Sequence, residues 1–167
     1  MARSFDGLAE SPASVERIHA AFGREDYWLA RIAGNAVATT LDSLSIDTDH
    51  TVTSQITLHF GRELMPGLVA KFVPNEFRMV QTETWTRGDE GQVHGQIGLV
   101  VSAGLGSCHA TAVLAPAGEG SQMRFAGKVV VKIPLLGGNL EKSIGSNVAE
   151  NVPEVLRFTS TWIAENS

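Results

Sequence analysis

The C-terminal stretch 139–167 constrains the fold more than any other part of the chain. If it is helical, the apolar residues of Leu140–Ile163 fall within an arc of roughly 160°, at ~100° per residue. The polar residues lie on the opposite side, except for Glu141, which stands in the first turn, where a helix dipole favours an acid. An apolar arc of this width is typical of a long helix that packs on a sheet. Asn139 is the expected N-cap, and Pro153 predicts a kink.

From residue 41 onward the hydrophobic pattern changes mostly to a period of two. Strands are expected there, joined largely by hairpin-length turns. They cover residues 41–47, 51–60, 76–87, 92–102, 107–115 and 122–133, and a weaker first strand covers 3–10. Strands in this arrangement form an antiparallel sheet with one apolar face.

Two short helices are expected directly after the first strand. One begins at Ser11–Pro12 and ends at Gly23, and the other, 27–33, is capped by Asp26. The apolar face of the long helix and that of the sheet must cover each other. The expected fold is therefore α+β: a strongly curved antiparallel sheet of about six to seven strands, wrapped around the C-terminal helix in one domain over residues 1–167.

Three short motifs add to this order of elements. They are Ser-Pro-Ala-Ser-Val at 11–15, Thr-Glu-Thr-Trp at 82–85 and Ile-Pro-Leu-Leu-Gly-Gly-Asn-Leu-Glu at 133–141. The order of the elements and these motifs, over nearly the whole chain, resemble those of the START-like (SRPBCC) helix-grip superfamily. This superfamily includes polyketide cyclases, pollen-allergen-like proteins and lipid-transfer domains. The chain looks most like a bacterial branch of that superfamily whose function is unassigned. The resemblance implies a hydrophobic cavity for a lipophilic small molecule.

The net charge and the absence of several motifs exclude some classes of binding partner and cofactor. A net charge of −5 without a cluster of lysine and arginine argues against nucleic acid and against electrostatic docking on an anionic membrane. The start of the chain has no apolar core like that of a signal peptide, and no run of about 18 apolar residues occurs. A single cysteine, Cys108, makes no internal disulfide, so the cytoplasm is the expected compartment. The histidines lack metal spacing and there is no phosphate loop, so neither a metal nor a cofactor is expected.

The predicted inner wall is almost free of ionisable groups. Such a wall binds a ligand by removing apolar area from water, at ~25 cal/mol per Å². It consists of Trp85, Ile97, Leu99, Phe125, Val129 and Val131 on strands and of Val148, Val152, Val155 and Leu156 on the helix. The same residues would equally make a filled core, because a sequence does not distinguish a packed interior from a hollow one.

The stretch 62–75 does not alternate, and its apolar residues recur at helical spacing. This stripe consists of Leu64, Met65, Leu68, Val69, Phe72 and Val73, and the first five of these are the lid candidates. It is interpreted as a lid over the cavity mouth, or as a patch that contacts a membrane, a partner protein or a second copy of the chain. A short helix packed on the edge of the sheet would show the same pattern.

Three residues are candidates for proton transfer: Glu83, Tyr27 and His109. Glu83 shares a strand face with Trp85, and a carboxylate beside an apolar wall can act as an acid or a base. The alternative for Glu83 is contact with water or an ion pair with Arg87. The alternative for His109 is a partly buried, hydrogen-bonded side chain.

These patterns lead to three hypotheses about function. The first is a protein that binds a hydrophobic small molecule, such as a lipid or a polycyclic compound, for transport or sequestration. The second is a cyclase- or aromatase-like enzyme, which needs at least two of the three proton-transfer candidates to converge in the cavity. The third is an interaction module that uses the apolar stripe within 64–73.

Overall fold

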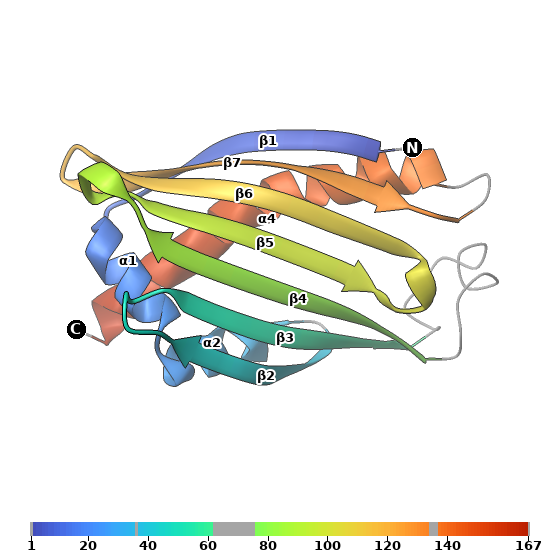
Figure 1. Ribbon diagram of the computed structural model, residues 1–167, viewed down its shortest axis with the longest axis horizontal. Coiled ribbons are helices and arrows are strands. Elements are labelled where there is room, and N and C mark those ends of the chain that lie inside the picture. The colour runs from blue at the N-terminus through green and yellow to red at the C-terminus, as the bar shows by residue number, and fades with distance from the viewer. Residues whose placement is uncertain (1, 36, 62–75, 134–136, 167) are drawn as a thin grey trace.

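The computed structural model describes residues 2–35, 37–61, 76–133 and 137–166. Within these ranges seven strands form one antiparallel sheet (Figure 1). The strands are β1 (Ala2–Ser11), β2 (Ala38–Ile46), β3 (Val52–Gly61), β4 (Glu76–Arg87), β5 (Val93–Val101), β6 (Gly106–Ala117) and β7 (Gly120–Val131). The helices are α1 (Val15–Phe22), α2 (Glu25–Ala33) and α4 (Gly137–Glu165). The strand order is β1-β7-β6-β5-β4-β3-β2, so all neighbours except β1 and β7 are consecutive in the chain.

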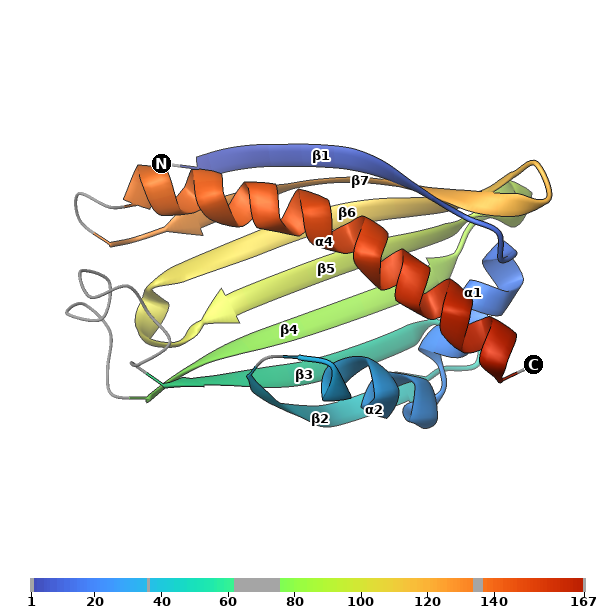
Figure 2. The same ribbon diagram turned by 180° about the vertical axis from the view of Figure 1, so that it is seen from behind.

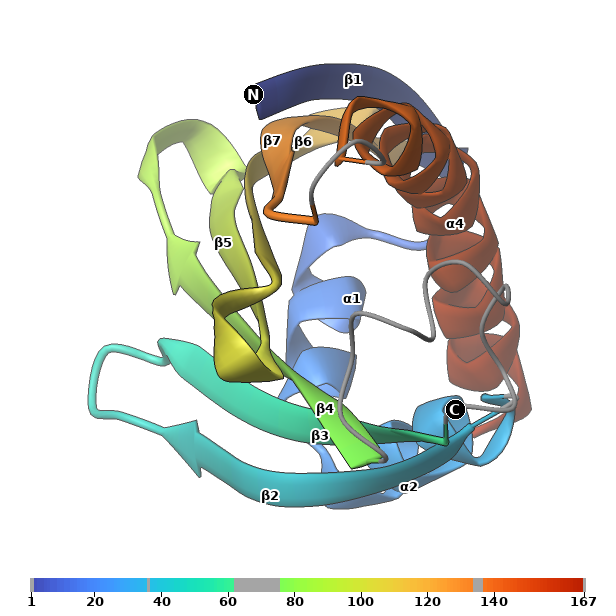
Figure 3. The same cartoon turned by 90° about the vertical axis from the view of Figure 1, so that its right-hand side faces the viewer.

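The sheet curls strongly, and α4 lies across its hollow side (Figure 3). α4 packs chiefly against β1 and β7, which form one side of the sheet, and its contacts with β4, β5 and β6 are few. The prediction of an α+β helix-grip fold, with two short helices after the first strand, is confirmed. Because α4 lies toward one side, the middle strands face the interior without a helix directly on them.

The long helix is continuous from Gly137 to Glu165, through Pro153. The N-cap expected at Asn139 is wrong, because the Gly137 amide already donates to the Ile133 carbonyl at 3.0 Å. Asn139 therefore lies inside α4, which begins at Gly137. Figure 2 shows the axis of α4 bending partway along, as an internal proline predicts. No helix in the described ranges is both long enough and apolar enough to cross a bilayer.

A buried carboxylate ties the start of α4 to the sheet. Glu141 is 2% exposed and accepts the backbone N–H of Val131 at 2.9 Å. Val131 is the last residue of β7, so this bond fixes where the helix leaves the strand. Because α4 begins at Gly137, Glu141 stands in the second turn. The hydrogen bond, rather than the dipole of a first turn, thus accounts for an acid on the inner face.

The start of α1 lies later in the chain than expected. Ser11 pairs with Ser121 as the last residue of β1, so the helix start predicted at Ser11–Pro12 is wrong. Ser14 is the N-cap, and its hydroxyl accepts the Arg17 N–H at 3.3 Å. Gly23 ends the helix, as expected.

The second short helix, α2, begins two residues before the expected Tyr27. The cap predicted at Asp26 is wrong, because Asp26 lies inside the helix and forms an exposed ion pair with Arg24 at 2.7 Å. Helix α2 presents Tyr27 and Trp28 to the interior, and both are fully buried.

Aromatic side chains fill the end of the molecule that holds α1, α2 and the C-terminal part of α4. Phe22 packs on Trp85 with 4.8 Å between ring centroids. Tyr27 meets Trp28 and Trp162 edge-on, at 5.7 and 5.4 Å. Edge-on contacts of this kind stabilise the fold beyond the contribution from burying the rings. This end is therefore largely filled by rings.

Candidate functional site

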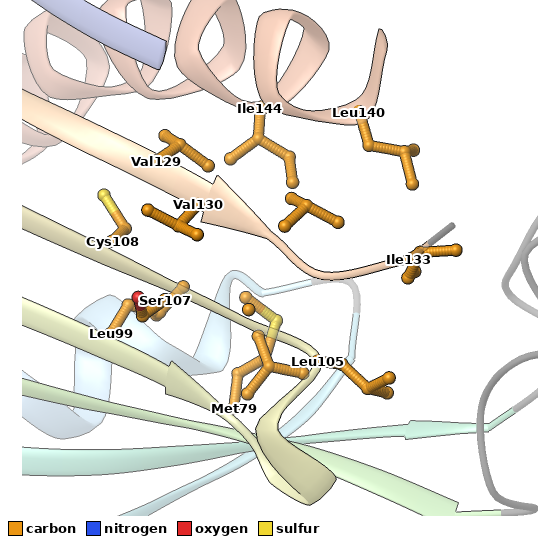
Figure 4. Close-up of a pocket in the computed structure, with 13 residues that line it drawn as sticks. Met79, Leu99, Leu105, Ser107, Cys108, Val129, Val130, Ile133, Leu140 and Ile144 are labelled. Carbon is orange, nitrogen blue, oxygen red and sulfur yellow. The ribbon is translucent and has the colours of Figure 1, made fainter. Parts of the chain in front are cut away.

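A cavity of about 250 Å³ lies beside the N-terminal half of α4. Figure 4 shows Leu140 and Ile144 pointing from α4 into the space, Ile144 beside Val129 of β7 and Leu140 on the side of Ile133, with Leu105 and Met79 across the space. The wall is built almost wholly from aliphatic and sulfur-containing side chains. Such a wall offers a guest apolar contact and little hydrogen bonding.

A second cavity, of about 150 Å³, lies beside the middle of α4. Leu99 and Cys108 line both cavities, so the two adjoin. Burial raises the pKa of the Cys108 thiol, which keeps it protonated at neutral pH. The second cavity differs from the first because polar side chains stand in its wall. They are Arg31, Gln81, Glu83, Asn151 and Thr159.

The ten residues expected in the apolar wall all line one cavity or the other. Val129 and Val131 line the first, and Leu99 lines both. The second is lined by Trp85, Ile97, Phe125, Val148, Val152, Val155 and Leu156. Their contact with a ligand stays a prediction. The apolar stripe within 64–73 lies outside the described residues, and its roles as a lid or contact surface stay predictions.

Three aromatic side chains of the second cavity lie over glycines of a neighbouring strand. The pairs, each directly opposite in the sheet, are Trp85 with Gly95, Phe125 with Gly7 and Phe5 with Gly127. A Cβ atom at any of these glycines would collide with the ring opposite. The absence of a side chain thus lets each ring settle against the sheet.

Glu83 is the centre of the polar group in this wall. It is 3% exposed, and its carboxylate accepts Arg31 Nη2 at 2.9 Å, Gln81 Nε2 at 2.6 Å and Trp85 Nε1 at 3.0 Å. The expected contact with water or with Arg87 is therefore wrong. The partner instead comes from α2, which packs mainly on β2 and reaches Glu83 of β4 through Arg31. Both carboxylate oxygens of Glu83 are thus used as hydrogen-bond acceptors.

Sequence reasoning missed Arg31, although a signal was present. Arg31 follows Tyr27 by four residues and Trp28 by three, which places it on the buried face of α2. Its guanidinium lies 4.5 Å from the centroid of the Trp28 ring. Burial alone lowers the pKa of Arg31, but the Glu83 carboxylate and Tyr27 outweigh it and hold that pKa above its ordinary value.

Tyr27 lies near Arg31 and contacts α4. Its hydroxyl is 2.6 Å from Thr159 Oγ1, which itself donates to the Val155 carbonyl at 2.8 Å. The Tyr27 hydroxyl is therefore the donor in the first of these bonds. Burial raises the pKa of Tyr27, so it stays protonated at neutral pH. The prediction of a partly buried His109 is wrong: this side chain is exposed, on the face of β6 opposite Cys108.

His19 on α1 gives the fold a pH dependence. It is buried with Nε2 3.3 Å from the Trp85 carbonyl, and burial lowers the pKa of its imidazole. The unfolded chain therefore binds the proton more readily, and stability should fall as pH drops below about 6.5. We expect His19→Gln to flatten the decline in urea midpoint between pH 7.5 and 5.5. His94→Gln is the control, because His94 is exposed. If His94→Gln flattens the dependence of the urea midpoint on pH as much as His19→Gln does, the assignment to His19 is contradicted.

Comparisons with known protein families, sequences and structures show what this chain is similar to. Residues 7–163 match the model of a family described as a protein of unknown function, DUF2505. The uncharacterized protein Rv0481c of Mycobacterium tuberculosis is 37% identical over 174 residues, which covers 99% of each chain. TTHA0849 of Thermus thermophilus is similar over 99% of both chains, with a TM-score of 0.55 and 18% identity. A START superfamily protein of Mycobacterium smegmatis covers 98% of this chain and 99% of its own, with a TM-score of 0.52 and 14% identity. The resemblance to the START-like fold is confirmed.

Proposed function

We propose, for a chain that belongs to the DUF2505 family and has a START-like fold, that it binds a hydrophobic small molecule between α4 and the sheet. A lipid or a polycyclic compound is the expected class, with transport or sequestration as the role. The observation that carries the proposal is the pair of adjoining cavities, of about 250 and 150 Å³, beside α4. Together they are on the scale of a small-molecule site, roughly 300–1,000 Å³.

The energetics of packing support the same proposal. Protein interiors are close-packed, and apolar space left empty in a core is destabilising. Unfilled space beside a well-packed aromatic core therefore supports a cavity that binds a ligand. An apolar guest would gain ~25 cal/mol for each Å² of apolar surface it removes from water.

A cyclase- or aromatase-like enzyme in the same cavity has less support. Such an enzyme needs a side chain free to give or take a proton. Glu83 and Tyr27 both flank Arg31, but the carboxylate already accepts three donors and the hydroxyl is bound to Thr159. His109 lies on the outer face of the sheet, away from the cavity.

Two neighbouring residues of β5 allow a matched test. Leu99 lines both cavities, whereas Val100 is 61% exposed on the other face. Leu99→Trp should fill the junction of the cavities and weaken binding of Nile red, a neutral apolar dye, at least ~tenfold. Val100→Trp adds the same side chain outside and should leave binding unchanged. Fluorescence titration measures both.

Two results would count against the proposal. One is a wild-type protein that binds neither the dye nor any fatty alcohol, fatty acid or sterol. The other is a Leu99→Trp variant that folds normally and binds the dye as tightly as Val100→Trp does. Native mass spectrometry of the gently purified protein gives an independent readout, since a bound guest adds its own mass.

A further inference from the structure

Arg31 is the cationic side chain in the wall of the second cavity. A guanidinium carries five N–H donors and no acceptor. Nη2 donates to Glu83, but the other terminal nitrogen, Nη1, is buried and forms no well-aligned hydrogen bond in the described part of the chain, although the Tyr27 side chain lies near the guanidinium. A buried donor without a partner costs free energy, so native proteins rarely keep one. A guest that brings an acceptor to Arg31 would remove this cost.

The charge around Arg31 is already balanced. One guanidinium faces one carboxylate, and Glu83 also receives the N–H groups of Gln81 and Trp85. An anionic guest would place a second carboxylate beside Glu83, with one cation to share between them. Burying that extra charge is strongly unfavourable, whereas a carbonyl or hydroxyl oxygen accepts a hydrogen bond without needing a counter-ion.

The two cavities also differ along the length of α4. The polar wall residues stand in the second cavity, and the first, beside Leu140 and Ile144, is almost wholly apolar. Given the proposed function, on which this inference rests, we propose that the guest is an elongated apolar molecule with an uncharged oxygen at one end. The oxygen accepts a hydrogen bond from Arg31, and the apolar body extends past Leu99 into the first cavity. Long-chain or polycyclic alcohols, ketones and esters are this class, and ionised fatty acids are not.

Ligands with one common tail test the head group. We would compare 1-dodecanol, methyl dodecanoate and dodecanoate as competitors of Nile red at pH 8, where the acid is ionised. The apolar contribution is nearly the same for all three. The wild-type protein should bind the alcohol and the ester at least ~tenfold more tightly than the acid. An acid that competes as well as the ester would overturn the inference, and this measurement needs no variant.

Any apolar cavity disfavours an anion, so a variant must show that Glu83 sets the preference. Glu83→Gln keeps the shape of the side chain and leaves the charge of Arg31 unbalanced. The ratio of acid to alcohol affinity should then rise at least ~tenfold. Arg157→Met is the charge-changing control, because Arg157 is 69% exposed on α4 and pairs only with Glu154 in the described structure. It should leave the ratio unchanged.

The outcomes separate the two proposals. If Glu83→Gln folds, as its circular dichroism would show, and its ratio stays within about twofold of wild type, the head-group inference fails while binding stands. If Nile red and all three competitors fail to bind the wild-type protein, the proposed function fails and the inference with it. A tenfold shift in Glu83→Gln, absent in Arg157→Met, supports both.

Discussion

Truncating Trp28 to alanine should lower the free energy of unfolding by about 3–5 kcal/mol. Trp28 is 0% exposed, and its indole N–H donates to the Phe22 carbonyl at 2.7 Å. The variant would leave a cavity between α2 and the core, and a buried carbonyl without its donor. It would also remove the ring on which the Arg31 guanidinium lies. We expect this to be among the most destabilising single substitutions in the chain.

The measurement is urea denaturation followed by circular dichroism, because removing a tryptophan alters the fluorescence signal itself. Leu29→Ala is the control on the same helix, since Leu29 is 49% exposed. It should change stability by no more than about 0.5 kcal/mol. A Trp28→Ala variant that loses less than about 1 kcal/mol would show that the aromatic core is far more tolerant than its packing indicates.

Removing one member of the Arg31–Glu83 pair should have the next largest effect. Arg31→Met would leave the Glu83 carboxylate buried with two donors and no cation. We expect a loss of about 3 kcal/mol, at the low end for buried pairs because the Arg31 side chain is still 16% exposed. Arg31→Met combined with Glu83→Gln removes the unpaired charge and should recover at least ~1 kcal/mol of that loss.

A double-mutant cycle measures this coupling directly. The exposed pair of Arg157 and Glu154 on α4 is the matched comparison, and Arg157→Met should cost no more than about 0.5 kcal/mol. If the double variant is less stable than Arg31→Met alone, the charge of Glu83 is not what makes the single substitution costly. The role given to this pair would then have to be abandoned.

Much of the fold could be predicted from local pattern. β4 occupies the residues expected, because its alternation is clear and Gly88 follows it directly. Gly23 ends α1 as predicted. Helix starts were less predictable: Ser11 and Ser14 are both suitable caps, and only the pairing of Ser11 with β7 decides between them.

The candidate site was harder to predict because its contacts are distant in the chain. Alternation placed Glu83 on the inner face of its strand, but its cationic partner lies 52 positions away, on a different element. Periodicity tells which face a residue occupies and not which residue it meets. Glu141 shows the same limit, since its acceptor role depends on where β7 ends. Whether Leu99 and Val129 enclose space or fill it depends on the placement of α4, which no residue type encodes.

The glycines opposite Trp85, Phe125 and Phe5 have a consequence for how this architecture diversifies. Adding one methyl group at Gly95 would push the indole of Trp85 off the sheet and into the interior. The capacity for a bound molecule would shrink, although residue 95 is not among those that line the cavity. An exchange of glycine for alanine opposite one of these rings would therefore change the size of the ligand that a relative can bind. No side chain that lines the cavity would need to be replaced.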